Sequence, residues 1–182
     1  MPEKPVVHSV KTIAQTRLFH IEAVELEFSN GERRQYERIN NDVAGSVTVI
    51  PVTDESVILI REYAVGSDAY ELGFVKGLID PGETPVEAGN RELKEEIGYG
   101  SRHIRQIRKT RVTPHYTTAI AYILLAEDLY AERCKGDEPE DLEQVHWPLS
   151  DINSLLEHQD INDVRTLHAL YWLRDYLSED RK

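Results

Sequence analysis

Residues 77–99 constrain the fold of this chain more than any other stretch, because they join a glycine-containing loop to a sharply delimited helix. Thr84 suits the N-cap position and Pro85 the first helical position. Glu87 follows Thr84 by three residues, which is the spacing of a capping box. Gly98 can adopt the left-handed conformation that ends a helix. The sequence therefore predicts a helix that begins at Pro85 and ends just before Gly98.

Three glutamates of this helix, Glu92, Glu95 and Glu96, are spaced three and four residues apart and so project from nearly one face. Like charges at this spacing destabilise an isolated helix by a few tenths of a kcal/mol per pair. A run of acidic residues is usually a solvated helix face. The same arrangement also suits hard cations such as Mg²⁺, which take oxygen ligands and share them with phosphates. Taken alone, the three carboxylates leave both interpretations open.

The surrounding segment favours the metal site, because it resembles the Nudix box, the signature motif of the Nudix hydrolase superfamily. The residues that match its fixed positions are Gly77, Glu83, Arg91, Glu92, Leu93, Glu95, Glu96 and Gly98. Tyr99 is the one loose fit, at a position that usually holds an aliphatic side chain. Each residue type makes up about a tenth or less of an average protein, so chance agreement at all these positions is negligible. The resemblance implies metal-dependent hydrolysis of a diphosphate attached to a nucleoside.

The resemblance also implies a role for each residue of the motif. Glu92 and Glu96 are the expected principal metal ligands. Glu95 is expected to ligate directly or through water and to take part in catalysis, and the carbonyl of Lys76 is a further expected ligand. The implied cofactor is Mg²⁺, with Mn²⁺ as the alternative, and its expected work is to stabilise charge on the phosphate oxygens and to lower the pKa of the attacking water.

Four further residues of the motif have structural roles in this interpretation. Glu83 and Arg91 correspond to the internal ion pair of the family, which ties the loop to the helix and positions the carboxylates. Gly77 permits a backbone geometry that a β-carbon would hinder, and Gly98 ends the helix.

The remaining sequence predicts an α+β fold. Residues 18–39 form a hairpin signal around an Asn30–Gly31 turn. Residues 46–52 and 56–63 indicate two core strands paired with each other. Further strands are expected at 70–75, 104–112, 119–126 and 145–147, and a closing helix at 162–177. This order predicts a mixed-sheet α/β/α sandwich with helices on both faces, which agrees with the Nudix fold. We expect an N-terminal β subdomain at 1–43, which serves dimerisation, and a Nudix domain with a C-terminal helix at 44–182.

Charge and composition exclude several partners. The chain has 33 acidic against 21 basic residues, a net charge of −12, so it lacks the phosphate neutralisation on which nucleic-acid binding depends. No apolar run is long enough to cross a membrane, and the N-terminus lacks the apolar stretch of a signal peptide. The lone Cys134 excludes an intramolecular disulfide and a thiolate metal cage. We therefore expect a cytoplasmic protein that contacts neither nucleic acid nor membrane.

Segments outside the box are similar to the ADP-ribose pyrophosphatase branch of the superfamily, and within it to the bacterial ADP-compounds hydrolases. The segments that carry this likeness are 61–66, 70–74 and 136–140. The resemblance implies that the substrate is a small nucleotide, namely ADP-ribose, NADH or a diadenosine polyphosphate, cleaved with release of AMP. It also implies a homodimer in which the N-terminal strands of one subunit help to form the substrate pocket of the other.

Candidate substrate-binding residues are Arg33, Tyr36 and Arg61, because guanidinium groups suit phosphates and aromatic faces suit adenine. Each could equally be a packing or surface residue. ADP-ribose pyrophosphatases usually place a Glu four residues before the first glycine of the box. This chain has Gly73 there, and Glu71 is the nearest glutamate.

The general base is expected in the acidic loop of residues 137–141, where the family places an acidic residue that supplies or assists the base. This loop offers Glu138 and Glu140, and we prefer Glu140. The alternative is an acidic turn with the base elsewhere. Two other functions compete with the leading one: a GDP-sugar (GDP-mannose) pyrophosphatase, and a Nudix nucleotide sensor without turnover. The complete set of motif glutamates argues against the sensor.

Overall fold

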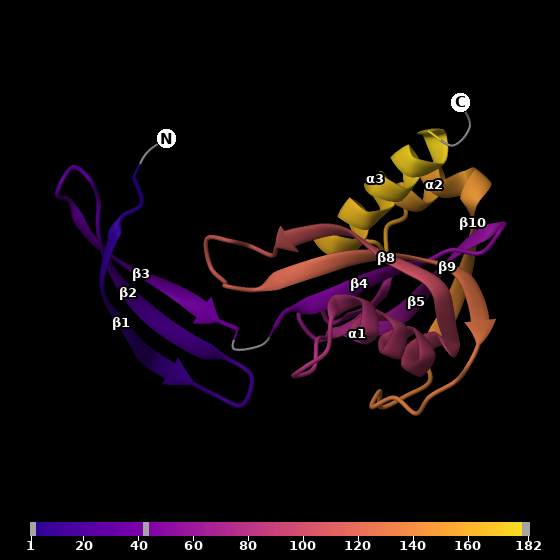
Figure 1. Cartoon of the computed structure of the whole chain (residues 1–182), viewed down its shortest axis with the longest axis horizontal. Coiled ribbons are helices and arrows are strands. Elements are labelled where there is room, and N and C mark those ends of the chain that lie inside the picture. Colours follow the sequence, from indigo (N-terminus) through magenta and orange to yellow (C-terminus); the bar gives the residue numbers. More distant parts are fainter. Residues whose placement is uncertain (1–2, 42–43, 180–182) are drawn as a thin grey trace.

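The computed structural model describes residues 3–41 and 44–179, which form three β-sheets and the helices that cover two of them (Figure 1). The domain boundary expected between residues 43 and 44 borders residues 42–43, which lie outside the described residues. In the part of the chain that is described, no helix is both long and apolar enough to cross a membrane.

The N-terminal sheet is antiparallel and has the strand order β1-β2-β3. Its strands are β1 (Val6–Gln15), β2 (His20–Glu27) and β3 (Arg33–Asn40). The predicted hairpin is the β2–β3 pair, and Gly31 in its turn has a φ of 82°, in the left-handed region. Strand β1 was not predicted, because two register shifts interrupt its pairing with β2 and so break the two-residue alternation that marks a strand.

The N-terminal sheet stands beside the rest of the molecule and contacts it through the end of β3 (Figure 1). The Ile39 amide donates to the Tyr116 carbonyl at 2.7 Å, and the Thr118 amide donates to the Ile39 carbonyl at 3.0 Å. These bonds join β3 to the loop of residues 112–119, which connects two strands of the main domain.

The first sheet of the main domain has the order β7-β4-β9-β8. Strands β4 and β9 are parallel, whereas the β4–β7 and β8–β9 pairs are antiparallel. The strands are β4 (Ser46–Pro51), β7 (Val75–Leu78), β8 (Tyr99–Arg111) and β9 (Ile120–Ala131). Strand β4 lies between two other strands, which agrees with the burial of all its residues after Ser46.

The second sheet has the order β10-β5-β6 and is antiparallel. Its strands are β5 (Ser56–Ala64), β6 (Ala69–Gly73) and β10 (Glu143–Pro148). The prediction that residues 46–52 and 56–63 pair with each other is wrong, because β4 and β5 lie in different sheets and meet only at an isolated bridge between Val52 and Val57. Each strand is the buried centre of its own sheet, and an apolar run does not specify its partners.

Helices cover both faces of these sheets, so the expected mixed-sheet α/β/α sandwich is confirmed. Helix α1 (Pro85–Glu92) continues into a π-helical turn, η1 (Leu93–Ile97), and packs on one core. Helices α2 (Ile152–Leu156) and α3 (Val164–Glu179), preceded by the short turn η2 (Leu149–Asp151), pack on the other. The C-terminal helix was predicted; α2 and η2 were not, since they are too short to show helical periodicity.

Candidate active site

The loop and helix of residues 77–99 have the local structure that their sequence predicts. The Thr84 hydroxyl accepts a hydrogen bond from the Glu87 amide, and the Glu87 carboxylate accepts one from the Thr84 amide at 2.8 Å, which completes the capping box. Gly98 ends the helix with a φ of 75°. The expected helix is α-helical only as far as Glu92, after which a π-helical turn carries Glu95 and Glu96. Such turns are rare and occur often at functional sites.

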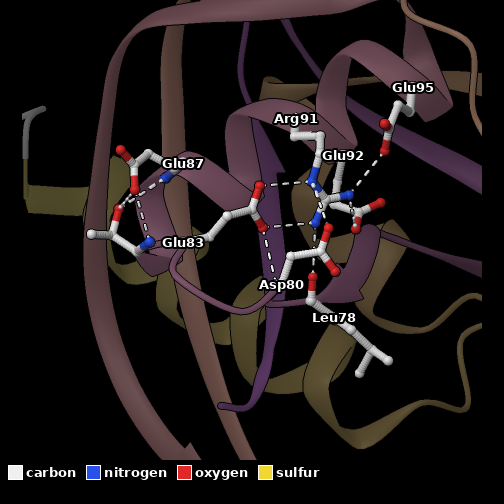
Figure 2. A network of polar contacts seen from close by, with 8 residues as sticks. Leu78, Asp80, Glu83, Glu87, Arg91, Glu92 and Glu95 are labelled. Carbon is white, nitrogen blue, oxygen red and sulfur yellow. Dashed lines mark hydrogen bonds and ion pairs between the residues drawn. The ribbon is translucent and has the colours of Figure 1, made fainter. Parts of the chain in front are cut away.

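Arg91 connects the loop to the glutamates of the helix (Figure 2). Its guanidinium group donates two hydrogen bonds to the Glu83 carboxylate, at 2.9 and 3.0 Å, and one to the Leu78 carbonyl at 2.9 Å. The Nη1 atom lies 2.8 Å from Glu92 and 3.0 Å from Glu95. The hydrogen bond from Arg91 holds the pKa of Glu83 below its ordinary value. The expected Glu83–Arg91 pair is thus present and lies next to the carboxylates that it was expected to position.

Gly77 lies directly against the carboxylate of Glu92. A β-carbon added at Gly77 would overlap the Glu92 carboxyl atoms, so the Glu92 side chain would have to move from its present position. The glycine therefore leaves the space that the Glu92 side chain fills.

Glu92 and Glu96 are buried acids, which is rare for residues of this type. Burial raises the pKa of Glu92 to about 7, although the hydrogen bond from Arg91 opposes the shift. Burial also raises the pKa of Glu96 to about 9, and the negative charges of Glu92, Glu62 and Glu138 add to this. The Glu96 Oε2 atom is buried and has no hydrogen-bond partner among the described residues. A buried carboxylate oxygen without a partner is costly, and a divalent cation would supply one.

The expected donor set fits a hard cation in its chemistry, since it consists of carboxylate oxygens and one backbone carbonyl oxygen. As the side chains stand, no group of three His, Cys, Asp or Glu residues in the described ranges has metal-ligand geometry. The Nη1 atom of Arg91 instead lies between Glu92 and Glu95, where it neutralises part of their charge.

A cleft of about 620 Å³ opens above these carboxylates, and we call it the carboxylate cleft. The motif glutamates line it together with Glu62, Lys76 and the loop of residues 135–139. Glu138 lies in this lining. Glu140 accepts a hydrogen bond of 2.8 Å from the Tyr70 hydroxyl and lines a neighbouring cleft, together with Glu138, Glu95 and Glu96. Of the two candidate bases, Glu138 lines both clefts, whereas Glu140 lines only the neighbouring one.

The predicted substrate-binding residues do not gather at the carboxylate cleft of a single chain. Arg61 donates to Asp160 at 2.7 Å and to Glu143 at 3.2 Å, and it lines neither this cleft nor its neighbour. Arg33 and Tyr36 lie on β3 of the N-terminal sheet, where Arg33 pairs with Glu27 and Tyr36 is half exposed.

A second cleft adjoins the carboxylate cleft, and we call it the side cleft. Glu71 lines it, together with Glu62, Lys76, Asn162, Asp163 and Arg165. Sequence reasoning missed Glu62, Arg165 and the side chain of Lys76, because these residues belong to no motif. Burial lowers the pKa of Lys76 below its ordinary value. The one signal that could have pointed to the Lys76 side chain is its position directly before Gly77, the first residue of the motif.

Comparison with known proteins gives a consistent result along the chain. The family model described as NUDIX domain matches residues 43–170, and the one described as NudE-type Nudix hydrolase N-terminal domain matches residues 5–38. The chain is 50% identical over 175 residues to the ADP compounds hydrolase NudE of Escherichia coli, which covers 96% of this chain and 94% of the relative.

More distant relatives and a solved structure agree. The chain is 28% identical to an ADP-ribose pyrophosphatase of Bacillus subtilis over 90% of its length and 92% of the relative's. It is 26% identical to a GDP-mannose pyrophosphatase of Citrobacter koseri, over 82% and 83%. A crystal structure of an ADP compounds hydrolase superposes with a TM-score of 0.93 at 48% identity, and the match covers 99% of this chain and 97% of that one.

Proposed function

This chain belongs to the Nudix hydrolase family, and we propose that it hydrolyses the diphosphate of ADP-linked compounds, ADP-X, to AMP and phosphorylated X. ADP-ribose, NADH and diadenosine polyphosphates are the substrates that we propose. The observation that carries the proposal is the buried Glu92–Glu96 pair, held beside Gly77 at the floor of an open cleft. The identity to an ADP compounds hydrolase along nearly the whole chain supports adenine as the base.

Nudix hydrolases need divalent cations, and we propose Mg²⁺ for this chain. The proposed ligands are Glu92, Glu96, Glu95 and the carbonyl of Lys76. The cation would neutralise charge on the diphosphate and make the attacking water more acidic. Arg91 and Glu83 hold the loop and the helix together, and a cation bound by Glu92 would compete with the hydrogen bond that Glu92 accepts from Arg91.

We propose Glu138 as the proton acceptor, in preference to Glu140. A base must lie within reach of the water whose proton it takes, and Glu138 lines the carboxylate cleft. In this step the water oxygen bonds to one phosphorus and the bond from that phosphorus to the bridging oxygen breaks. The other phosphate leaves with the bridging oxygen, and the proton of the water passes to Glu138. Glu140 lines only the neighbouring cleft, and its carboxylate accepts a hydrogen bond from Tyr70.

We propose that the active unit is a homodimer joined through the N-terminal sheet. Strand β1 exposes Val6, Val7, Val10 and Ile13, each by 46% or more, which is unusual for a strand with so many apolar side chains. Arg33 and Tyr36 of β3 would then reach the partner's substrate, a role that they cannot have at the cleft of their own chain.

Product analysis by mass spectrometry tests the proposed activity. The protein is incubated with ADP-ribose, NADH, diadenosine triphosphate and GDP-mannose, each with Mg²⁺ and with a chelator. We expect AMP from the adenine compounds in the presence of Mg²⁺ only. GMP from GDP-mannose without AMP from the others would instead assign the chain to the activity of its GDP-mannose pyrophosphatase relatives. The absence of any product would support a nucleotide sensor.

A further inference from the structure

The side cleft, of about 390 Å³, is continuous with the carboxylate cleft, because Glu62 and Lys76 line both. A substrate whose diphosphate lies against Glu92 and Glu96 can therefore extend past Lys76 into the side cleft. The charged and hydrogen-bonding side chains that line the side cleft would then determine which groups X the site accepts.

The ammonium group of Lys76 has fewer partners than its burial requires. The side chain is 18% exposed, and its Nζ atom donates to the Phe74 carbonyl at 3.1 Å. Its ion-pair partner Asp163 is 3.9 Å away, at the outer limit of such a contact. An ammonium carries three N–H donors, and within the described chain only one of them makes a hydrogen bond. Buried donors without acceptors are costly, so this group is suited to an anionic ligand in the cleft.

Gly73 makes the room in which the Lys76 ammonium lies. A β-carbon at Gly73 would come 2.7 Å from Lys76 Nζ and 3.1 Å from Thr166 Oγ1. The Lys76 ammonium therefore lies close to the position that the β-carbon of any larger residue at position 73 would take.

The acidic residues of the side cleft are largely engaged by the start of α3. Glu71 accepts a hydrogen bond from the Asn162 side chain at 2.8 Å. Asp163 accepts hydrogen bonds from Thr166 and from the Nε atom of Arg165. Glu62 remains at the junction with the carboxylate cleft. In the described ranges, the terminal nitrogens of Arg165 make no hydrogen bond, so this guanidinium is the second cation that a ligand in the side cleft can meet.

We infer that Lys76 and Arg165 bind the phosphoryl end of the substrate that leaves with X. Lys76 contacts the phosphate that carries X, and Arg165 contacts a further phosphate where X has one. This inference rests on the proposed function and refines it, because it makes Arg165 a determinant of preference for X groups with an additional phosphate, such as those of dinucleoside triphosphates.

Steady-state kinetics of three variants test the inference. Lys76→Met should lower kcat/KM at least about tenfold for both ADP-ribose and diadenosine triphosphate, because each loses a charged contact to phosphate. Arg165→Met should lower kcat/KM about tenfold for diadenosine triphosphate and less than about twofold for ADP-ribose. The control, Arg174→Met, removes a charge from the same helix at a site that lines neither cleft and should change neither value. An equal effect of Arg165→Met on both substrates would overturn the role of Arg165.

A binding measurement separates this inference from the proposed activity. Ribose 5-phosphate and AMP are titrated into the protein in a chelator and followed by ³¹P NMR. We expect Lys76→Met to weaken binding of ribose 5-phosphate at least about tenfold and to leave AMP within about twofold. Unchanged ribose 5-phosphate binding, or none to the unaltered protein, would overturn the role of Lys76. The result does not depend on which nucleotide is hydrolysed, and Lys76→Gln, which also removes the charge but keeps a polar side chain, provides a second test if Lys76→Met does not fold.

Discussion

At the scale of single residues, Gly77 affects the position of Glu92, since a β-carbon there would overlap the Glu92 carboxylate. Gly77→Ala should displace Glu92 and lower kcat/KM by about 10–100-fold, the range usual for residues that orient metal ligands. Gly66→Ala is the matched control, because a β-carbon at Gly66 meets nothing within 4 Å. Kinetics with ADP-ribose decide the matter, and full activity of the Gly77 variant would refute the proposed role of Glu92.

Glu96 gives the chain a specific dependence on pH. Its pKa is about 9 in the folded chain against 4.5 ordinarily, so between these values the folded state binds more protons than the unfolded state. The free energy of unfolding therefore falls as pH rises through this window. In a chelator, we expect the melting temperature to fall between about pH 5 and pH 9, and to fall less in Glu96→Gln. If the melting temperatures of the two proteins fell by the same amount over this pH range, the assignment to Glu96 would be contradicted. The same variant should lose hydrolysis with Mg²⁺.

The sequence predicts single residues well only inside the motif. The spacing of residues 77–98 predicted the capping box and the left-handed Gly98, and the resemblance to the Nudix box implied the Glu83–Arg91 pair. The preference for Glu140 over Glu138 had no such local basis, because the contact of Glu140 with Tyr70 joins residues that are 70 positions apart. The arrangement of Lys76 and Gly73 against α3 likewise depends on packing between distant segments.

At the scale of elements, the capping box determines where α1 begins. Thr84→Ala removes the side-chain acceptor of the Glu87 amide and should lower the free energy of unfolding by about 1 kcal/mol. Glu87→Gln retains an acceptor for the Thr84 amide and should cost less. Urea denaturation in the chelated state measures both, and a Thr84 variant as stable as the unaltered chain would show that packing alone fixes the start of the helix.

The elements themselves were mostly predictable, whereas their partners were not. Helices α1 and α3 and most strands of the main domain overlap their predicted ranges, because periodicity and end signals are local. Strand β7 was not predicted as a separate strand, β8 begins five residues before its predicted range, and β9 ends five residues after it. The separation of β4 and β5 into two sheets is a non-local property that their apolar runs do not encode. The π-helical turn after Glu92 also escaped prediction, since its residues have the same spacing as those of an α-helix.

At the scale of the whole molecule, the exposed apolar side chains of β1 predict association. We expect sedimentation to give about twice the chain mass of 20.9 kDa. Replacing Val10 and Ile13 together by lysine should yield a monomer with at least about tenfold lower kcat/KM, because charges oppose burial in an interface and the partner's Arg33 and Tyr36 are lost. A control that replaces Val65 by lysine, a residue exposed by 86% in another part of the molecule, should remain dimeric. A monomeric unaltered protein would remove the dimer from the proposal.

The contacts of Arg91 with Glu92 and Glu95 have a consequence for the charge balance of the cleft. The guanidinium group lies between these two carboxylates and already offsets part of their mutual repulsion. A cation that enters the cleft would therefore exchange with a positive charge that the protein itself supplies, instead of being the first to reach these carboxylates.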